Sequence, residues 1–299
     1  MDKIALENIS EAGHDEWFDT GWWFEPFGLD RPAVLAKLRE VLPQSLDARS
    51  LPPVSRKCYP LADGEPEGTL LLWPGPRCGL AMLVSLGGDR QQLVSIWPFT
   101  SDGSTYRMEI DRVRLAPDRL QAIITGAIGN ELVIEWHDIN FAMNRSFYVK
   151  GSVHEVALAG IAHSVRFGAP PPLEFALDHP LHAHLLDLQP ETAITPSGTI
   201  PLVMDQMASI MPIDDETPTL YSISGPVVAV EPYTGQLFGR TAWMVDVIVA
   251  RIGVGTEEDV TLSVLFTDKV LGSHTPPVPG GYLSAAIRLQ GRIWLPNVT

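Results

Sequence analysis

The stretch QLFGRTAWMVDVIVAR (236–251) decides the fold class, because apolar or β-branched residues occupy every second position through most of it. Side chains alternate along a strand, so one face would carry Thr241, Trp243, Val245, Val247 and Val249. VTLSVLF (260–266) repeats the alternation. A period of two with many β-branched residues is typical of half-buried strands.

Similar signals mark the chain before residue 167. TLLLW (69–73), LAMLVSL (80–86) and QLVSIWPF (92–99) are apolar runs near glycine or proline, as buried strands usually are. RLQAIITGAIGNELVIEWHDINF (119–141) predicts a hairpin that turns at Gly129-Asn130. The alternation breaks within MEIDRVRL (108–115), which predicts a bulge. SVHEVALAGIAH (152–163) fits a strand or a short helix.

One segment, RPAVLAKLREVL (31–42), predicts a helix. Asp30 precedes it as a capping residue, and Pro32 lies in its first turn, where proline is tolerated. An apolar stripe at helical spacing consists of Val34, Leu35, Leu38 and Leu42. Such a stripe usually docks against a sheet of the same domain.

These patterns predict a mainly β chain with two small β-barrel or sandwich units, residues 56–166 and residues 222–299. Five short strands are expected in the second unit, which resembles an OB-fold barrel in size and strand number. The three prolines of GSHTPPVPGG (272–281) depart from that pattern, because many OB barrels carry a helix before their last strands. Residues 1–55 would form an N-terminal arm and the helix.

The segment between the two units, residues 167–221, is an acidic and Pro-rich connector. It contains 8 Asp and Glu but no Lys or Arg, and it holds 9 of the 26 prolines. Composition of this kind is typical of a boundary between folded regions. Its leucines and other apolar residues predict that it packs irregularly across its neighbours.

Composition also bears on partners and location. The net charge of −15 opposes general binding to nucleic acid or to anionic lipid, because both reward clustered Lys and Arg. The start MDKIALENIS has no apolar run behind its charges, and no stretch approaches 18 apolar residues, so we expect a cytoplasmic protein outside the membrane. Cys58 and Cys78 are too few for a disulfide framework, although one bridge between them stays open.

Aromatic residues crowd the N-terminal arm around Asp19-Thr20-Gly21, a triplet found in aspartic proteases. Those enzymes need two carboxylates that share a proton, and no second triplet of this kind occurs. We therefore interpret the aromatic residues as an interaction surface that pins the arm onto the body or onto another copy. They are Trp17, Trp22, Trp23, Phe24 and Phe27.

The best candidate metal ligands lie in DHPLHAHLLD (178–187), and they are His179, His182, His184 and Asp187. His182 and His184 would share a strand face, whereas His179 and His182 would be neighbours on a helix. Zinc takes about four ligands, so either geometry needs further ligands from elsewhere. A polar surface turn and a pH-sensitive contact are the alternatives, and no other cofactor is expected.

No complete catalytic motif is found, including the Gly-x-Ser-x-Gly elbow and the glycine loops of nucleotide-binding sites. The sequence therefore favours a non-enzymatic binding or assembly protein that contacts protein or itself. One alternative is a metal-dependent hydrolase that uses the dispersed histidines His137, His154 and His163. The other is an OB-type nucleic-acid binder, which the acidic charge opposes. Its stacking residues would be Tyr233, Phe238, Trp243, Tyr282 and Trp294.

Overall fold

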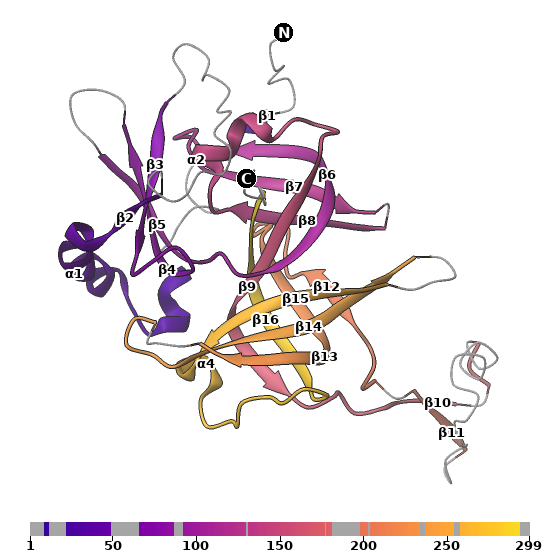
Figure 1. Ribbon diagram of the computed structural model, residues 1–299. Coiled ribbons are helices and arrows are strands. Elements are labelled where there is room, and N and C mark those ends of the chain that lie inside the picture. The colour runs from indigo at the N-terminus through magenta and orange to yellow at the C-terminus, as the bar shows by residue number, and fades with distance from the viewer. Residues whose placement is uncertain are drawn as a thin grey trace, which may run out of the picture.

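A computed structural model describes residues 9–11, 22–48, 66–86, 92–129, 131–176, 178–180, 198–202, 204–233, 237–253 and 258–293. Strands dominate these residues, as the alternating pattern predicts, and the helices are few (Figure 1). No helix in the described ranges is both long and apolar enough to cross a membrane.

The N-terminal part of the chain builds a four-stranded antiparallel sheet with helices beside it. Asp30 caps helix α1 by accepting a hydrogen bond from the N–H of Ala33 at 2.9 Å, so the predicted helix and its cap are confirmed. The sheet has the order β2-β3-β4-β5. The elements are η1 (Trp22–Phe27), α1 (Arg31–Val41), η2 (Leu42–Gln44), β2 (Leu46–Asp47), β3 (Gly68–Trp73), β4 (Cys78–Ser85) and β5 (Gln92–Thr100).

Most of the other described strands form one ten-stranded sheet that closes into two rings. The first ring has the order β6-β7-β8-β16-β9, and pairing of β6 with β9 closes it. The second ring has the order β9-β15-β14-β13-β16, and pairing of β16 with β13 closes it. The strands are β6 (Ser104–Leu115), β7 (Ala122–Ile128), β8 (Leu132–Asp138), β9 (Val153–Phe167), β13 (Leu220–Pro232), β14 (Ala242–Ile252), β15 (Glu258–Thr267) and β16 (Tyr282–Ile293).

The two rings therefore share strands β9 and β16, which pair antiparallel along most of their length (Figure 1). The second unit was expected to hold five strands of its own, but residues 222–299 contribute four, and β9 supplies the fifth. The mainly β fold is confirmed, whereas the division into two separate units is not. The pattern of buried positions shows which face of a strand is apolar, but it does not identify the strand's neighbours.

Both rings are built in the same order along the chain: three antiparallel strands, a short helix and a long strand. The helices are α2 (Phe141–Asn144), which a short turn η4 (Arg145–Phe147) follows, and α4 (Asp268–Leu271). The first half of this part of the chain consists of β6 to β9, and the second half of β13 to β16. Strand β8 of the first half pairs in parallel with β16, and β15 of the second half pairs in parallel with β9. The two halves thus follow the same order of elements, and each half completes the ring of the other.

Hydrogen bonds at the start of the long strands repeat this relation in detail. In the first ring Ile110 N–H donates to Ser152 O at 2.9 Å, and Gly151 N–H donates to Ile110 O at 2.7 Å. The same two bonds join Val227 to Gly280–Gly281 at 2.9 and 2.8 Å. Gly151 and Gly280 both have positive φ, 78° and 82°, which glycine adopts without strain.

Apolar residues fill the rings as the alternation predicts. Val245, Val247 and Val249 of β14 are buried, as are alternate residues of β15, and all belong to one continuous core. The predicted bulge of the 108–115 strand is present between Ile110 and Arg112 of β6. The turn at Gly129 also has the expected positive φ of 58°.

The described residues of segment 167–221 include three short strands. Strands β10 (Leu173–Ala176) and β11 (Thr199–Leu202) form a two-stranded sheet of their own, which projects away from the rings in Figure 1. Strand β12 (Ser209–Pro212) adds to β13 and forms one end of the ten-stranded sheet. At the other end, β1 (Ile9–Glu11) pairs in parallel with β6.

Candidate functional site

A buried polar cluster lies where the four-stranded sheet covers the shared strands β9 and β16. Ile161 of β9 and Arg288 of β16 are directly opposite each other, so their side chains leave the ribbon on the same face. The side chains that meet there form a shallow recess with no room for a water molecule. Its lining residues are Trp23, Pro98, Ile161, His163, Arg288 and Gln290.

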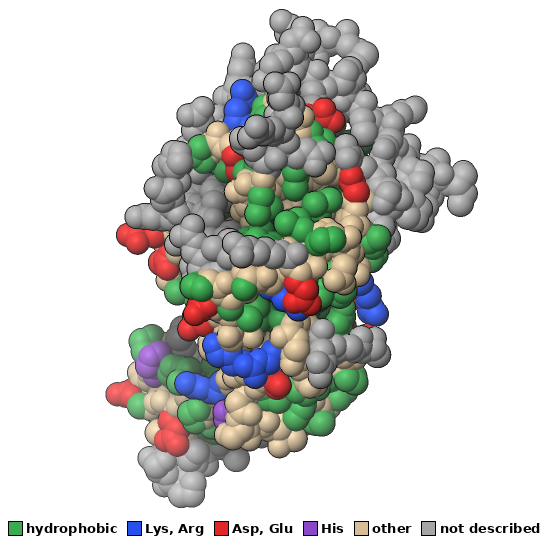
Figure 2. Space-filling model, turned by 90° about the vertical axis from the view of Figure 1, so that its left-hand side faces the viewer, with side chains coloured by type: hydrophobic (Ala, Val, Ile, Leu, Met, Phe, Trp, Pro, Cys, Tyr) green, Lys and Arg blue, Asp and Glu red, His purple; other side chains and the backbone are tan. Residues whose placement is uncertain are grey.

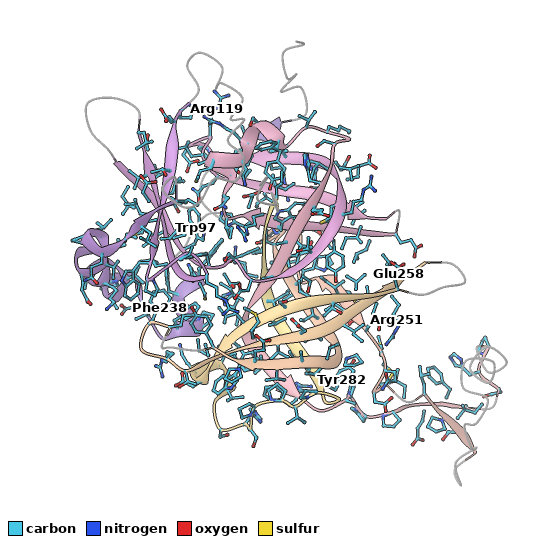
Figure 3. All side chains as sticks on the ribbon, viewed as in Figure 1. Trp97, Arg119, Phe238, Arg251, Glu258 and Tyr282 are labelled. Carbon is cyan, nitrogen blue, oxygen red and sulfur yellow. The ribbon has the colours of Figure 1, made fainter. Side chains whose placement is uncertain are left out.

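Two tryptophans from different elements enclose His137 of β8. Trp23 of η1 and Trp97 of β5 contact the imidazole edge-to-face, with ring centroids 4.8 and 5.0 Å away. The guanidinium of Arg288 lies over the ring of Trp23 at 4.5 Å, a distance suited to a cation–π contact. Figure 3 shows Trp97 at the junction between the four-stranded sheet and the rings. The aromatic rings thus shield the cluster from solvent.

Gln290 joins the rings to the edge of the four-stranded sheet. Its Nε2 donates to Pro98 O at 2.7 Å, and its Oε1 accepts from Thr100 N–H at 3.4 Å. The side-chain amide therefore takes the place that a neighbouring strand would have beside β5. Arg292 Nη2 donates to Ser101 O at 3.3 Å just beyond it. These contacts fix the N-terminal sheet on the ribbon.

Three consecutive carbonyl groups at the end of η1 accept hydrogen bonds from side chains of the second ring and the loop beside it. Lys269 Nζ donates to Glu25 O at 2.7 Å, Arg240 Nε donates to Phe27 O at 3.4 Å, and Thr267 Oγ1 donates to Pro26 O. Figure 2 shows that Lys and Arg side chains gather in the lower half of the face that carries the four-stranded sheet. Carbonyl groups at the end of a helix favour nearby cations, so this arrangement stabilises η1 over the cluster.

Burial controls the protonation of the cluster. Burial, helped by the positive charge of Arg288, lowers the pKa of His137 to about 3 and that of His163 to about 4. Burial raises the pKa of Asp138 to about 8, although Asn140 N–H donates to its Oδ1 at 2.6 Å. At neutral pH both imidazoles are therefore neutral and the Asp138 carboxyl is mostly protonated.

The shifted pKa values of His137, His163 and Asp138 predict that their contribution to the free energy of unfolding is greatest near pH 6.5. The unfolded chain binds protons on the two histidines below pH 6.5, while the folded chain retains the proton on Asp138 up to about pH 8. Between about pH 4 and 6.5 the unfolded chain holds two protons on these histidines and the folded chain holds one on Asp138, so the free energy of unfolding should rise with pH. Between pH 6.5 and 8 only the proton on folded Asp138 remains, so the free energy of unfolding should fall.

The variant Asp138→Asn isolates the alkaline part of this profile. Asn keeps the acceptor for Asn140 and stays neutral in both states, so the loss of about 2 kcal/mol expected between pH 6.5 and 8 should disappear. Urea unfolding at several pH values measures it. Asp111→Asn, at an exposed position, is the control and should leave the profile unchanged. If the free energy of unfolding of Asp138→Asn still fell between pH 6.5 and 8 as it does in the unchanged chain, the Asp138 carboxyl would not be the cause of that fall.

The structure brings together some of the predicted site residues. Trp23, Phe24 and Phe27 are buried against the chain's own strands, in keeping with an arm pinned to the body. Trp17 lies outside the described residues, as does the side chain of Trp22. Among the dispersed histidines, His137 and His163 converge on Trp23 and Arg288. His154 lies at the start of β9, with Nε2 2.9 Å from Ser152 Oγ.

The candidate metal ligands are only partly described. His179 packs edge-to-face on Phe175 of the projecting hairpin at 4.9 Å, and its N–H donates to Ala176 O at 3.0 Å. His182, His184 and Asp187 lie outside the described ranges. Within those ranges no group of three or more His, Cys, Asp and Glu side chains is arranged to hold a metal ion.

Sequence reasoning missed Trp97, Arg288 and Gln290 as members of the cluster, and Asp138 as a buried carboxyl beside it. The polar residues of AAIRLQGRIW alternate with apolar ones, which predicts a solvent-facing side of a strand. Cys78 was expected to be a thiol, and it is: it is buried, with a pKa raised to about 12 by burial, which leaves it unreactive.

No protein-family model, no curated protein and no solved structure matches this chain.

Proposed function

We propose that this protein is a non-enzymatic binding or assembly protein that contacts a protein partner through segment 167–221. The observation that carries the proposal is the β10–β11 hairpin, which forms its own sheet and projects from the rings (Figure 1). A two-stranded hairpin gains little stability by itself in water. An arm of this kind, with half of Leu173 exposed, is suited to packing on a second surface.

The state of the titratable groups supports binding over catalysis. General acid–base chemistry needs a group within hydrogen-bond reach of a substrate. His137 is buried behind Trp23 and Trp97, and His163 is partly buried, with a pKa lowered to about 4. The Cys78 thiol, with its pKa of about 12, is not a nucleophile at neutral pH. The hydrolase alternative would need η1 to leave the recess.

Nucleic-acid binding is a second candidate, favoured by the order of the rings. Each ring is OB-like in having five strands, with a short helix between its third strand and its own long strand. Several predicted stacking residues have other roles, because Phe238 packs on Phe27 at 5.0 Å and Tyr282 is buried. Trp294 lies outside the described residues. Fluorescence anisotropy with single-stranded DNA and RNA at low salt tests this candidate, and binding at micromolar protein would favour it.

A panel of unstructured peptides tests the principal proposal. We expect the full chain to bind at least one class among basic, acidic and neutral peptides of matched apolar content, or to self-associate by light scattering. The variant Leu173→Ser/Phe175→Ser should weaken that interaction at least tenfold, because it removes apolar contacts of the hairpin. Val133→Ser, an exposed change on β8, is the matched control. A strict monomer that binds no peptide at high concentration would contradict the proposal.

A further inference from the structure

Within the part of the chain that the structure describes, strand β12 pairs with β13 on one side and with no strand on the other. Ile213 N–H donates to Leu220 O at 3.0 Å, and hydrogen-bonded pairs alternate along antiparallel strands. Met211 therefore directs its backbone groups toward β13, whereas Ile210 and Pro212 direct theirs outward. Proline lacks an N–H, so Pro212 is placed where no donor to β13 is needed. This edge carries no lysine, and its one guard is Pro212, which presents a C=O but no N–H, so Ile210 is the residue of β12 that offers both groups.

Apolar side chains beside this edge are exposed. Met207, Met211 and Ile213 are 45%, 56% and 45% exposed, respectively. Methionine is flexible and polarisable, and it is common at surfaces that accept varied partners. The edge therefore offers both unpaired backbone groups and apolar contact area.

The chain leading into β12 is held in place by the second ring. Tyr282 Oη donates to Met207 O at 2.9 Å, and Arg251 Nη1 donates to Gln206 O at 2.7 Å. Figure 3 labels Tyr282 and Arg251 on the side of the rings from which the β10–β11 hairpin extends. An edge fixed in this way needs little reordering when a segment binds, which favours affinity.

The charge around the edge is negative. Four exposed carboxylates flank β12, and none of them forms an ion pair within the described ranges: Asp205, Asp214, Asp215 and Glu216. The nearby cation Arg251 is engaged with Asp259 at 3.0 Å. Two copies that paired through β12 would bring these like charges together. A basic segment would be attracted instead.

We propose that the outer edge of β12 binds a basic, extended segment of a partner protein as an added strand. This inference rests on the proposed binding function and assigns it a site and a partner chemistry. Main-chain hydrogen bonds to Ile210 would supply affinity, as in other cases of strand addition. Met207, Met211 and Ile213 would contact alternate side chains of the added strand, and the flanking carboxylates would contact its Lys and Arg.

The test is fluorescence anisotropy of the full chain with a labelled twelve-residue peptide in which Lys alternates with Val. Binding should weaken as salt is raised, because exposed charges are screened. Asp214→Asn/Asp215→Asn/Glu216→Gln should weaken binding at least tenfold at low salt and flatten the salt dependence. Asp111→Asn/Glu109→Gln, acidic changes on β6, is the matched control and should leave binding unchanged.

A second measurement tests strand addition without altering the protein. The same peptide with N-methyl groups at alternate residues cannot donate main-chain hydrogen bonds along one edge, so its dissociation constant should rise at least tenfold. Ile210→Pro should also weaken binding, because it removes the outward N–H. Ile210→Ala is its control, because it removes the side chain that packs on the core but keeps that N–H. Equal binding of the methylated peptide would overturn strand addition. If the panel finds only acidic peptides, neutral peptides or self-association, the binding function stands and this inference fails.

Discussion

Replacing Trp136 with alanine is expected to lower the free energy of unfolding by about 3–5 kcal/mol, the usual loss for a fully buried tryptophan. Trp136 of β8 is fully buried in the first ring. An added Cβ at Gly126 of β7 or Gly291 of β16 would lie 2.9 or 2.5 Å from its indole. The indole thus fills the space that two glycines leave on neighbouring strands.

Urea unfolding followed by circular dichroism measures this loss. Trp243→Ala is the matched control, because Trp243 is only partly buried and stacks on Phe266 with centroids 5.8 Å apart. It should cost less than Trp136→Ala. Because the rings share β16, the Trp136→Ala chain should still unfold in one transition. A loss no larger than that of the control would show that the first ring is not packed around Trp136.

Gly225→Ala is expected to cost about 3 kcal/mol or more, because the added methyl group would require backbone movement. Gly225 of β13 pairs with Leu283 of β16, and its Cβ would lie 1.8 Å from Ile248 O on β14. No rotation of a side chain relieves a contact with a carbonyl oxygen of the same ring. The second ring would have to open locally.

Gly75→Ala is the control for this change. A Cβ at Gly75 would meet no atom within 4 Å, and its φ is not positive. The change should alter stability by less than about 1 kcal/mol. Thermal unfolding of the two variants in parallel makes the comparison. A Gly225→Ala variant as stable as Gly75→Ala would contradict the close approach of β13 to β14.

The sequence predicted local structure well because local structure depends on nearby residues. Val245, Val247 and Val249 showed one buried face, and Asp30 showed the start of a helix. It did not predict that β9 closes the second ring, because a period of two is the same whichever strand lies alongside. The repeated order of elements was not predicted for a similar reason: the hydrogen bonds of Ile110 and Val227 join backbone groups, which depend on no particular side chain.

The polar cluster was only partly predictable. His137 and His163 were named because histidine is rare and titrates near neutral pH. Arg288 and Gln290 alternate with apolar residues, as residues facing water do. Only the packing of η1 and β5 over the ribbon buries them, and that contact joins residues 22–27 to residues 288–290. Contacts between such distant segments leave no periodic signal in the sequence.

The central claim is that residues 104–167 and 220–293 share the β9–β16 ribbon, and an engineered disulfide tests it most directly. Ser164 of β9 lies directly opposite Ala286 of β16. Under mild oxidation Ser164→Cys/Ala286→Cys should form a 164–286 bond, because opposed side chains on paired strands are about 5 Å apart at Cβ. Peptide mapping by mass spectrometry should find it in the double variant and in neither single variant. A folded double variant without this bond would contradict the shared ribbon.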